Sequence, residues 1–409
     1  MADQAEQAFI LACLTHRLYP DRPLPSAPEG LDWEQVHGLL AGHGLMRLFY
    51  ALGREEAGLW PQSFQRLLRA DYVAARLWGD LCAAEVQAAL VALHAAGIAT
   101  LVLKGWALIP TLYGGDPGLR LCGDLDLLVQ PVGAERAEQV IQQLGYRAAL
   151  EQWPGFGRRY RNSRAFFRAR QPWPFADSFA VALHWGLLDT PYYYGKIDCG
   201  ALFQRSEPVY VAGMETRRLS TEDYLVYACG HVALHHDYDE SLHRPYELAA
   251  LILWAGAALD WAAVADHAAQ WRLVVPVQRV LGRLGELWPG IVPEGVAGQI
   301  AALRATRPER AVHRWVVSER QNHGVRALVA GLTLPGLRRR GRYLLEAAFP
   351  GPDYLRRRYG AAPGGAWPLL YLRRFGLAAR YAAAAAGHAI GAGWRRRHGR
   401  GPNQGRGDV

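Results

Sequence analysis

A segment between residues 98 and 129 places two strand-like runs on either side of a helix-like run. The apolar run 98–103 is typical of a buried strand, and helical spacing resumes over 106–113. After a Gly/Pro turn, residues 124–129 alternate between polar and apolar as a half-buried strand does. A chain with this order has to form a sheet that is covered at least in part by helices.

Helices are expected on both sides of this segment. Apolar residues recur at helical spacing over 4–96, and helices are expected to dominate again over 224–332. Further elements are predicted as a helix at 134–144, strands at 159–168 and 179–185, and a hairpin at 209–219. Ser220 and the acids after it predict the start of the helix that follows the hairpin. The predicted fold class is α+β, with a small mixed α/β core flanked by N-terminal and C-terminal helical regions.

Four regions are predicted along the chain. They are an N-terminal helical region at 1–98, the mixed core at 99–205, a hairpin with a helical domain at 206–336, and a tail at 337–409. The tail carries fifteen arginines against three acidic residues from 338 onward, a local net charge of +12, whereas the whole chain has a net charge of +9. The basic character therefore belongs to the tail, and its Gly-rich end at 399–409 is predicted to be disordered.

The remaining composition favours a folded cytoplasmic protein. The five cysteines lie far apart without C-x-x-C spacing, so they are interpreted as reduced thiols and not as disulfides or a zinc knuckle. Residues 1–7 are acidic and polar, which does not fit a signal peptide. The weakly polar run 381–394 is shorter than the roughly 20 residues that span a bilayer.

Asp124 and Asp126 are the first candidates for chemistry. Two residues apart in a strand, both carboxylates project from the same face and repel each other unless a cation lies between them. Ligand sets made only of oxygen suit Mg²⁺ or Mn²⁺, which also bind substrate phosphates. An isolated pair of this kind is more often a turn aspartate with a solvated neighbour.

Lys104 and Gly105 strengthen the case for phosphate chemistry. They stand where the predicted strand 98–103 passes into a helix, and backbone N–H groups at such a helix start bind phosphate. Glycine allows a ligand to approach closely, and lysine adds a compact positive charge. Only two of the 46 basic residues are lysine. An ordinary turn between a strand and a helix is the alternative explanation.

These motifs together resemble a known family. The Leu-Lys-Gly at 103–105, Arg120, and the Gly-Asp-Leu-Asp at 123–126 with its following apolar residues are similar to the uncharacterised nucleotidyltransferase family of the DNA polymerase β-like superfamily. The resemblance extends over most of residues 30–260, through segments 33–52, 181–185 and 219–225. The tail lies outside it.

The resemblance implies metal-dependent transfer of a nucleoside monophosphate from an NTP to an acceptor hydroxyl. Paired Mg²⁺ or Mn²⁺ ions would neutralise phosphate charge in such a reaction. The implied catalytic and metal-binding residues are Asp124 and Asp126. The implied nucleotide contacts are Lys104, Gly105, Arg120 and Gly123, and possible substrate contacts are Tyr113, His184 and His231. ATP is the default donor, and a sugar, peptide, protein or small molecule could be the acceptor.

A third metal-binding carboxylate is the expected feature that this chain lacks. The family implies an acid on the strand 179–185, near Ala182, but no acid lies within that run. Asp177 and Asp189 flank the strand as substitutes, and His184 or water could complete the metal shell instead. A degraded site that binds nucleotide or a partner without turnover is the alternative function.

Several histidines follow in the predicted helix 224–236. His231 and His235 have the i, i+4 spacing of zinc ligands, but Val232 excludes the H-E-x-x-H protease pattern. We interpret these residues, with His236 and His243, as contacts to substrate or packing beside Tyr227 in preference to a metal site.

Two further partner classes are weighed for the tail. The segment 369–386 mixes arginine with leucine and tyrosine, so it could lie on an anionic membrane surface or bind nucleic acid through phosphate contacts. No aromatic RNA-binding signature accompanies the charge. A solvated arginine-rich helix is the preferred interpretation.

Overall fold

The computed structural model describes residues 2–56, 60–169, 178–236, 238–239, 241–318, 328–329, 331–360 and 369–376. The chain divides into two compact units. The first consists of residues 1–149 and 157–313, and the second of residues 150–156 and 314–409. The four regions predicted from the sequence stay predictions.

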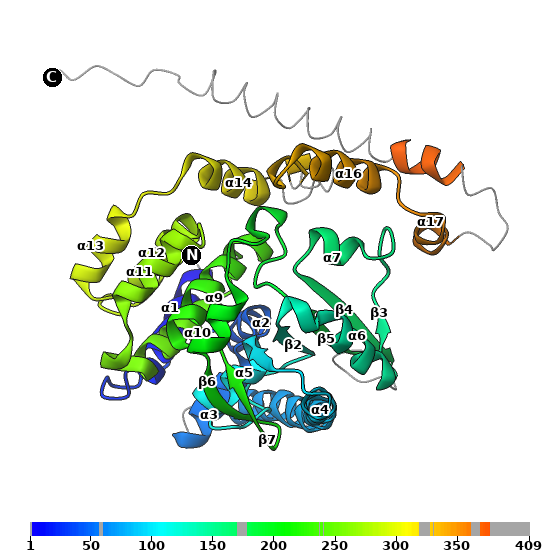
Figure 1. Ribbon diagram of the computed structural model, residues 1–409. Coiled ribbons are helices and arrows are strands. Elements are labelled where there is room, and N and C mark those ends of the chain that lie inside the picture. Colours follow the sequence, from blue (N-terminus) through cyan, green and yellow to red (C-terminus); the bar gives the residue numbers. More distant parts are fainter. Residues whose placement is uncertain are drawn as a thin grey trace. The chain divides into compact units, whose positions relative to one another are not determined.

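A seven-stranded mixed sheet lies at the centre of the first unit (Figure 1). Its strand order is β3-β4-β5-β2-β1-β7-β6. The middle of the sheet pairs β2 antiparallel with β1 and parallel with β5. The strands are β1 (Thr100–Leu103), β2 (Asp124–Val129), β3 (Arg147–Ala148), β4 (Ser163–Ala169), β5 (Ser178–His184), β6 (Glu207–Val211) and β7 (Met214–Arg218). The predicted α+β fold class is confirmed, and the hairpin predicted outside the core extends the same sheet through β7.

Four helices precede the sheet. They are α1 (Ala2–Leu18), α2 (Trp33–His43), α3 (Met46–Glu55) and α4 (Gln62–Ala95). Asp32 begins α2 by accepting hydrogen bonds from the backbone N–H groups of Glu34 and Gln35. The N-terminal helical region predicted from apolar spacing therefore matches these four elements.

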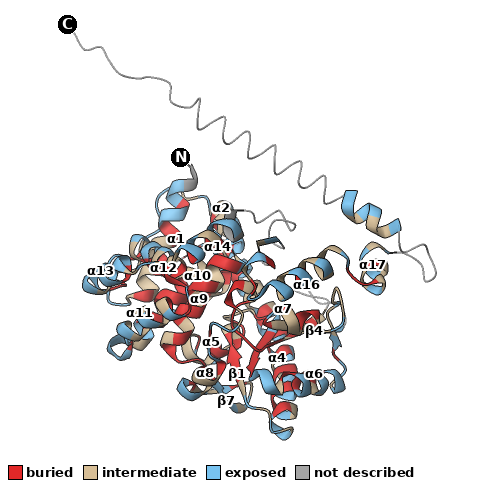
Figure 2. Cartoon of the chain, turned by 45° about the horizontal axis from the view of Figure 1, so that its top comes forward, coloured by how far each residue is buried: buried red, intermediate tan, exposed pale blue. Residues whose placement is uncertain are grey.

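The two faces of the sheet have different surroundings. Leu125, Leu127 and Val129 of β2 pack in one apolar cluster with residues of α4 and α6 (Ala134–Gln143). Buried residues accordingly gather along the strands and on the helices beside them (Figure 2). Because side chains alternate along a strand, residues 124, 126 and 128 point to the opposite face. The carboxylates are thus kept out of the α4–α6 core.

The remaining helices follow β1 along the chain. They are α5 (Lys104–Leu112), α7 (Phe156–Tyr160), α8 (Cys199–Arg205), α9 (Thr221–His235), α10 (His243–Ala255), α11 (Trp261–Gln270), α12 (Val274–Leu287), α13 (Glu294–Ala302), α14 (Arg307–Ser318), α16 (Leu337–Ala348) and α17 (Pro352–Tyr359). Ser220 caps α9, since its side chain accepts from the N–H of Asp223. The start of this helix was predicted at that residue.

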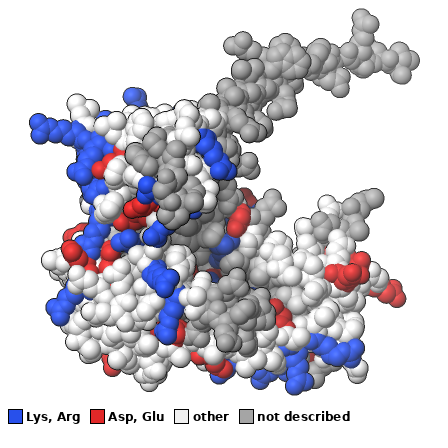
Figure 3. All heavy atoms as spheres, turned by 90° about the vertical axis from the view of Figure 1, so that its right-hand side faces the viewer, with Lys and Arg blue, Asp and Glu red and all other residues white. Residues whose placement is uncertain are grey.

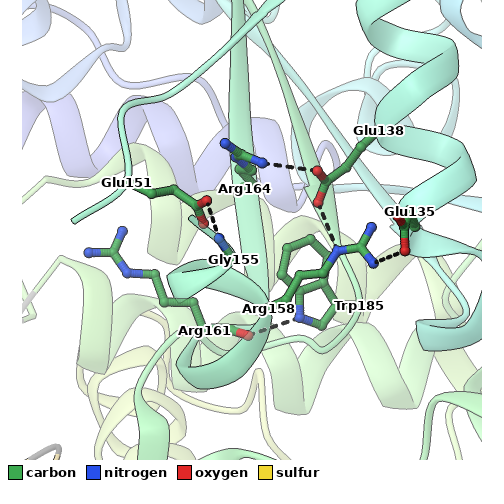
Figure 4. Close-up of polar contacts among 8 residues, drawn as sticks. All are labelled: Glu135, Glu138, Glu151, Gly155, Arg158, Arg161, Arg164 and Trp185. Atoms are coloured by element: carbon green, nitrogen blue, oxygen red, sulfur yellow. Dashed lines mark hydrogen bonds and ion pairs between the residues drawn. The ribbon is translucent and has the colours of Figure 1, made fainter. Parts of the chain in front are cut away.

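The strand predicted at 159–168 begins later in the structure than the sequence indicated. Residues 156–160 form α7, and β4 begins only at Ser163. The short elements α7 and β3 have five and two residues, too few for a periodic pattern to appear in the sequence. Nearby, Glu138 of α6 accepts from Arg158 and Arg164 at 3.3 and 3.0 Å, and so connects α6 to α7 and β4 (Figure 4).

The second unit contains α16 and α17. In it the N–H of Gly351 donates to the carbonyl of Gln152 at 2.7 Å, and the indole of Trp153 donates to the carbonyl of Phe349 at 2.7 Å. These bonds join residues 150–156 to the tail. The predicted disordered end at 399–409 and residues 377–386 of the amphipathic segment lie outside the described residues.

Acidic side chains lie among the basic ones on the face drawn in Figure 3. Among the described residues, no helix combines the length and the apolar character needed to cross a bilayer.

Candidate active site

Asp124 and Asp126 begin β2 with different exposure. Asp124 is exposed, whereas Asp126 is only 4 % exposed. Asp126 lies opposite Leu103 of β1 and opposite Ala182 of β5. His184 lies two residues beyond Ala182 on the same face of β5. The site is therefore built where β1, β2 and β5 run side by side.

One carboxylate oxygen of Asp126 is hydrogen-bonded to two side chains, those of Lys104 and His184. Lys104 Nζ and His184 Nε2 both lie 2.7 Å from Asp126 Oδ1. The three side chains come from the start of α5, from β2 and from the end of β5. The sequence predicted all three as site residues but did not predict that they bond to each other.

Lys104 has a backbone conformation that favours glycine. Its φ is 53°, in the left-handed region, although it begins α5 directly after β1. A residue with a Cβ in this region costs about 1–2 kcal/mol relative to ordinary helix geometry. The conformation turns the chain from strand to helix within one residue and directs the ammonium toward Asp126.

The carboxylates have pKa values shifted in opposite directions. Loss of hydration and the negative charge of Asp126 raise the pKa of Asp124. Burial acts in the same sense on Asp126, but the ammonium of Lys104 and the hydrogen bond from His184 outweigh it and hold the pKa of Asp126 well below its ordinary value. The buried carboxylate is therefore ionised, and the exposed one is the stronger base.

Gly105 is required by packing. A Cβ on this residue would lie 2.4 Å from the sulfur of Cys122, which is much closer than two such atoms can approach. The carbonyl of Cys122 in turn accepts from the indole of Trp78 at 3.2 Å. Gly123 differs, since a Cβ there would meet no atom within 4 Å. Its predicted role in nucleotide binding stays a prediction.

Arg120 and Tyr113 both bond to Glu247 of α10. Arg120 Nε lies 2.5 Å from Glu247 Oε1, and the Tyr113 hydroxyl donates to the same oxygen at 2.9 Å. Arg120 also donates to the carbonyl of Leu121. Burial opposes the ionised form of Glu247, but Arg120, His243 and the hydrogen bond from Tyr113 together outweigh it and lower the pKa of the carboxyl. The phosphate contact predicted for Arg120 and the substrate contact predicted for Tyr113 stay predictions. In the structure both side chains bond to Glu247.

The α9 histidines meet at the C-terminal end of that helix. One possible ligand atom from each of His231, His235 and His236 lies within 4.8 Å of the others, the one such group of three among the described residues. Burial is the largest cause that lowers the pKa of each imidazole, to about 4 for His236. Lys104 and Asp126 both affect the pKa of His231 and His235, so the cluster lies within electrostatic reach of the carboxylate site.

Tyr227 was cited from the sequence only as a packing neighbour of the histidines. Its side chain is 1 % exposed, and its hydroxyl has no hydrogen-bond partner among the described residues. Burial raises its pKa most, followed by the charges of Asp126, Asp189 and Asp124. A buried hydroxyl beside three carboxylates is a further candidate for substrate contact. Its spacing with His231 on α9 was the only signal in the sequence.

Asp189, one of the two acids predicted as a possible third carboxylate, has partners of its own. Asp189 accepts from the Ser163 hydroxyl at 2.6 and 2.8 Å and from the N–H of Asn162, so it stabilises the start of β4. Asp177 lies outside the described residues. The two oxygen-donating carboxylates fit one Mg²⁺ that also binds substrate phosphates. The register leaves Ala182 where a third ligand is needed for two ions.

The buried ion pair between Arg120 and Glu247 makes the free energy of unfolding depend on pH. Replacing Glu247 by Gln leaves Arg120 without its charged partner and is expected to lower the free energy of unfolding at pH 7 by about 3 kcal/mol. The pKa of Glu247 lies below its ordinary value of 4.5 in the folded chain, so its contribution is present above pH 4.5 and is lost as the pH falls through the folded-state pKa.

Denaturant unfolding at a series of pH values measures this difference. The difference in the free energy of unfolding between wild type and Glu247→Gln should become smaller as the pH falls below 4.5. The exposed pair Arg283–Glu286 provides the control, and Glu286→Gln should change stability by no more than about 0.5 kcal/mol. A gap that stays constant over this pH range would contradict the assigned ion pair.

Comparison with known proteins adds the family. The profile of a family described as uncharacterised nucleotidyltransferase matches residues 29–289. No curated protein matches the chain. The crystal structure of an antigenic nucleotidyltransferase-like protein from Paracoccidioides brasiliensis shares 14 % identity, with 57 % of this chain and 94 % of that chain covered and a TM-score of 0.30, which is too distant to bear on function. The matched region contains the strands, the paired aspartates and the α9 histidines, and the chain belongs to the uncharacterised nucleotidyltransferase family.

Proposed function

We propose that this protein transfers a nucleoside monophosphate from an NTP to an acceptor hydroxyl at Asp124 and Asp126. The observation that carries the proposal is the meeting of Lys104, Asp126 and His184 at one buried oxygen, beside the exposed Asp124. A carboxylate pair next to a lysine at a helix start combines groups that bind a divalent cation with groups that bind phosphate.

The start of α5 is the proposed triphosphate site. Its first backbone N–H groups have no partner inside the helix and attract anions, and Lys104 adds a full positive charge at the same place. Gly105 keeps the helix start close to Cys122, and Gly123 leaves open space beside Asp124. Arg120 is also proposed to contact the triphosphate, and its bond to Glu247 holds the guanidinium in place.

Asp124 and Asp126 would hold Mg²⁺ or Mn²⁺ together with phosphate oxygens of the bound nucleotide. When bound, such an ion neutralises phosphate charge and orients the α-phosphate. The raised pKa of Asp124 supports this assignment, because a cation would relieve the repulsion from Asp126.

The reaction exchanges one P–O bond for another. The acceptor oxygen forms a bond to the α-phosphorus while the bond from that phosphorus to the β-phosphate oxygen breaks, and pyrophosphate leaves with the electron pair. The acceptor proton passes to solvent water, because Asp124 and Asp126 would both be ligands of the cation. Asp126 stays ionised throughout.

Acceptor contacts are proposed for the α9 side of the site. Tyr227 offers a hydroxyl without a described partner, and His231 lies one turn further along the helix. His184 is committed to Asp126, and Tyr113 to Glu247. ATP is the default donor, and a sugar, peptide, protein or small molecule provides the hydroxyl. The basic tail is a less favoured route to nucleic acid or a membrane surface.

A nucleotide-binding module without turnover is the second candidate function. Ala182 opposite Asp126 favours it, because the position lacks the acid that a second metal ion needs. The buried oxygen of Asp126 already has two partners within the chain, the ammonium of Lys104 and the ring nitrogen of His184. In this case nucleotide binds in the presence of Mg²⁺, and no pyrophosphate is released.

Label transfer from each α-labelled NTP, measured together with pyrophosphate release and nucleotide binding, tests the main proposal. Wild type with Mg²⁺ or Mn²⁺ should transfer label, and the double variant Asp124→Asn, Asp126→Asn should lose at least about 100-fold, as expected when groups that stabilise the transition state are removed. Asp80→Asn, an exposed aspartate of α4, is the matched control and should keep full activity. Failure to bind any NTP would refute the proposal, and binding without turnover would support the second candidate.

The missing acid gives a gain-of-function test. Ala182→Asp places a carboxylate opposite Asp126 and should lower the Mn²⁺ concentration required for nucleotide binding or transfer by at least about tenfold, the effect of one additional interaction of 1.4 kcal/mol. Ala182→Asn has nearly the same shape without the charge and should not do so. Equal metal dependence in the two variants would show that position 182 does not contribute to a metal site.

A further inference from the structure

We propose that His231, His235 and His236 bind one divalent transition-metal ion of the zinc class and leave one coordination position open. This site differs in ligands from the carboxylate pair and takes a different metal. It does not depend on the proposed nucleotidyl transfer.

The geometry brings three imidazoles together at the end of α9. His231 and His235 are one helical turn apart, and His236 is the capping residue that follows α9. A ligand atom from each lies within 4.8 Å of the others. Two nitrogens on one zinc ion at about 2.1 Å are at most about 4.2 Å apart, so small rotations of the rings are enough to bind it.

The three imidazole rings lie against one another. The rings of His231 and His235 stack with centroids 4.9 Å apart, and those of His231 and His236 are 4.8 Å apart. His231 and His236 are half-buried, and His235 is exposed. A metal ion held by the three rings would take one nitrogen from each as a ligand.

The ligand chemistry selects the metal. Imidazole nitrogen suits zinc, cobalt, nickel and copper, whereas Mg²⁺ prefers oxygen. Burial favours the neutral imidazole, which is the form that binds metals. Three protein ligands with a fourth open position are typical of catalytic zinc sites. The open position would accept water or an anionic substrate oxygen.

The surrounding charges act in both directions. Lys104 lies close enough to disfavour a cation at His231 and His235, while Asp126 favours one at both and Asp189 favours one at His235. Arg244 and Asp239 oppose each other in the same way at His236. The three nitrogen ligands therefore have to bind the metal ion in the presence of these positive charges.

Cobalt titration of the full-length, tag-free chain after removal of metals by a chelator tests the site directly. Co²⁺ should give visible d–d bands that saturate at one equivalent, and Zn²⁺ should displace it. Bands from thiolate ligands should be missing, because the five cysteines are buried and none belongs to the group of three ligands. The exposed His235 is the first residue to vary, since His235→Ala leaves the helix core intact.

His235→Ala and His236→Ala should each weaken Co²⁺ and Zn²⁺ binding by at least about tenfold. His94→Ala, at an exposed position near the end of α4, should bind as wild type does. The variant Asp124→Asn, Asp126→Asn should also keep zinc binding, which separates this site from nucleotide chemistry. Saturable binding that survives both histidine variants, or no binding to wild type, would overturn the proposal.

Discussion

The buried carboxylate of Asp126 is the constraint on which the rest of the site depends. An ionised group with 4 % exposure is stable only when it is paired and hydrogen-bonded, and Lys104 and His184 provide both at 2.7 Å. These partners come from different elements on either side of β2. The charge of Asp126 is therefore stabilised only when β1, β2 and β5 pair in this register. It also requires the left-handed conformation of Lys104 at the turn from β1 to α5.

A second buried pair extends this arrangement to the helical part of the chain. Glu247 of α10 bonds to Arg120 and Tyr113, which lie on either side of the turn between α5 and β2. That turn determines where α5 ends and where β2 begins. The candidate site thus combines strands and a turn of the sheet with side chains from α9 and α10, all within the matched residues 29–289.

Much of this was predictable from the sequence because the signals are local. Alternation located β2, the Leu-Lys-Gly run located the start of α5, and the missing acid near Ala182 matched the register opposite Asp126. The pairing of Glu247 with Arg120 was not predictable, since the two residues are 127 positions apart and no pattern links them. The inclusion of His236 depends on the chain direction just after α9, which helical spacing does not define.

Diffraction from crystals grown with Mn²⁺ and an NTP analogue that cannot be cleaved at the α–β bond tests the central claim most directly. The anomalous signal of Mn²⁺ locates the metal without reference to activity. The account predicts a peak between Asp124 and Asp126, with the triphosphate at the start of α5 near Lys104. A nucleotide bound elsewhere, or Mn²⁺ without contact to either aspartate, would contradict it.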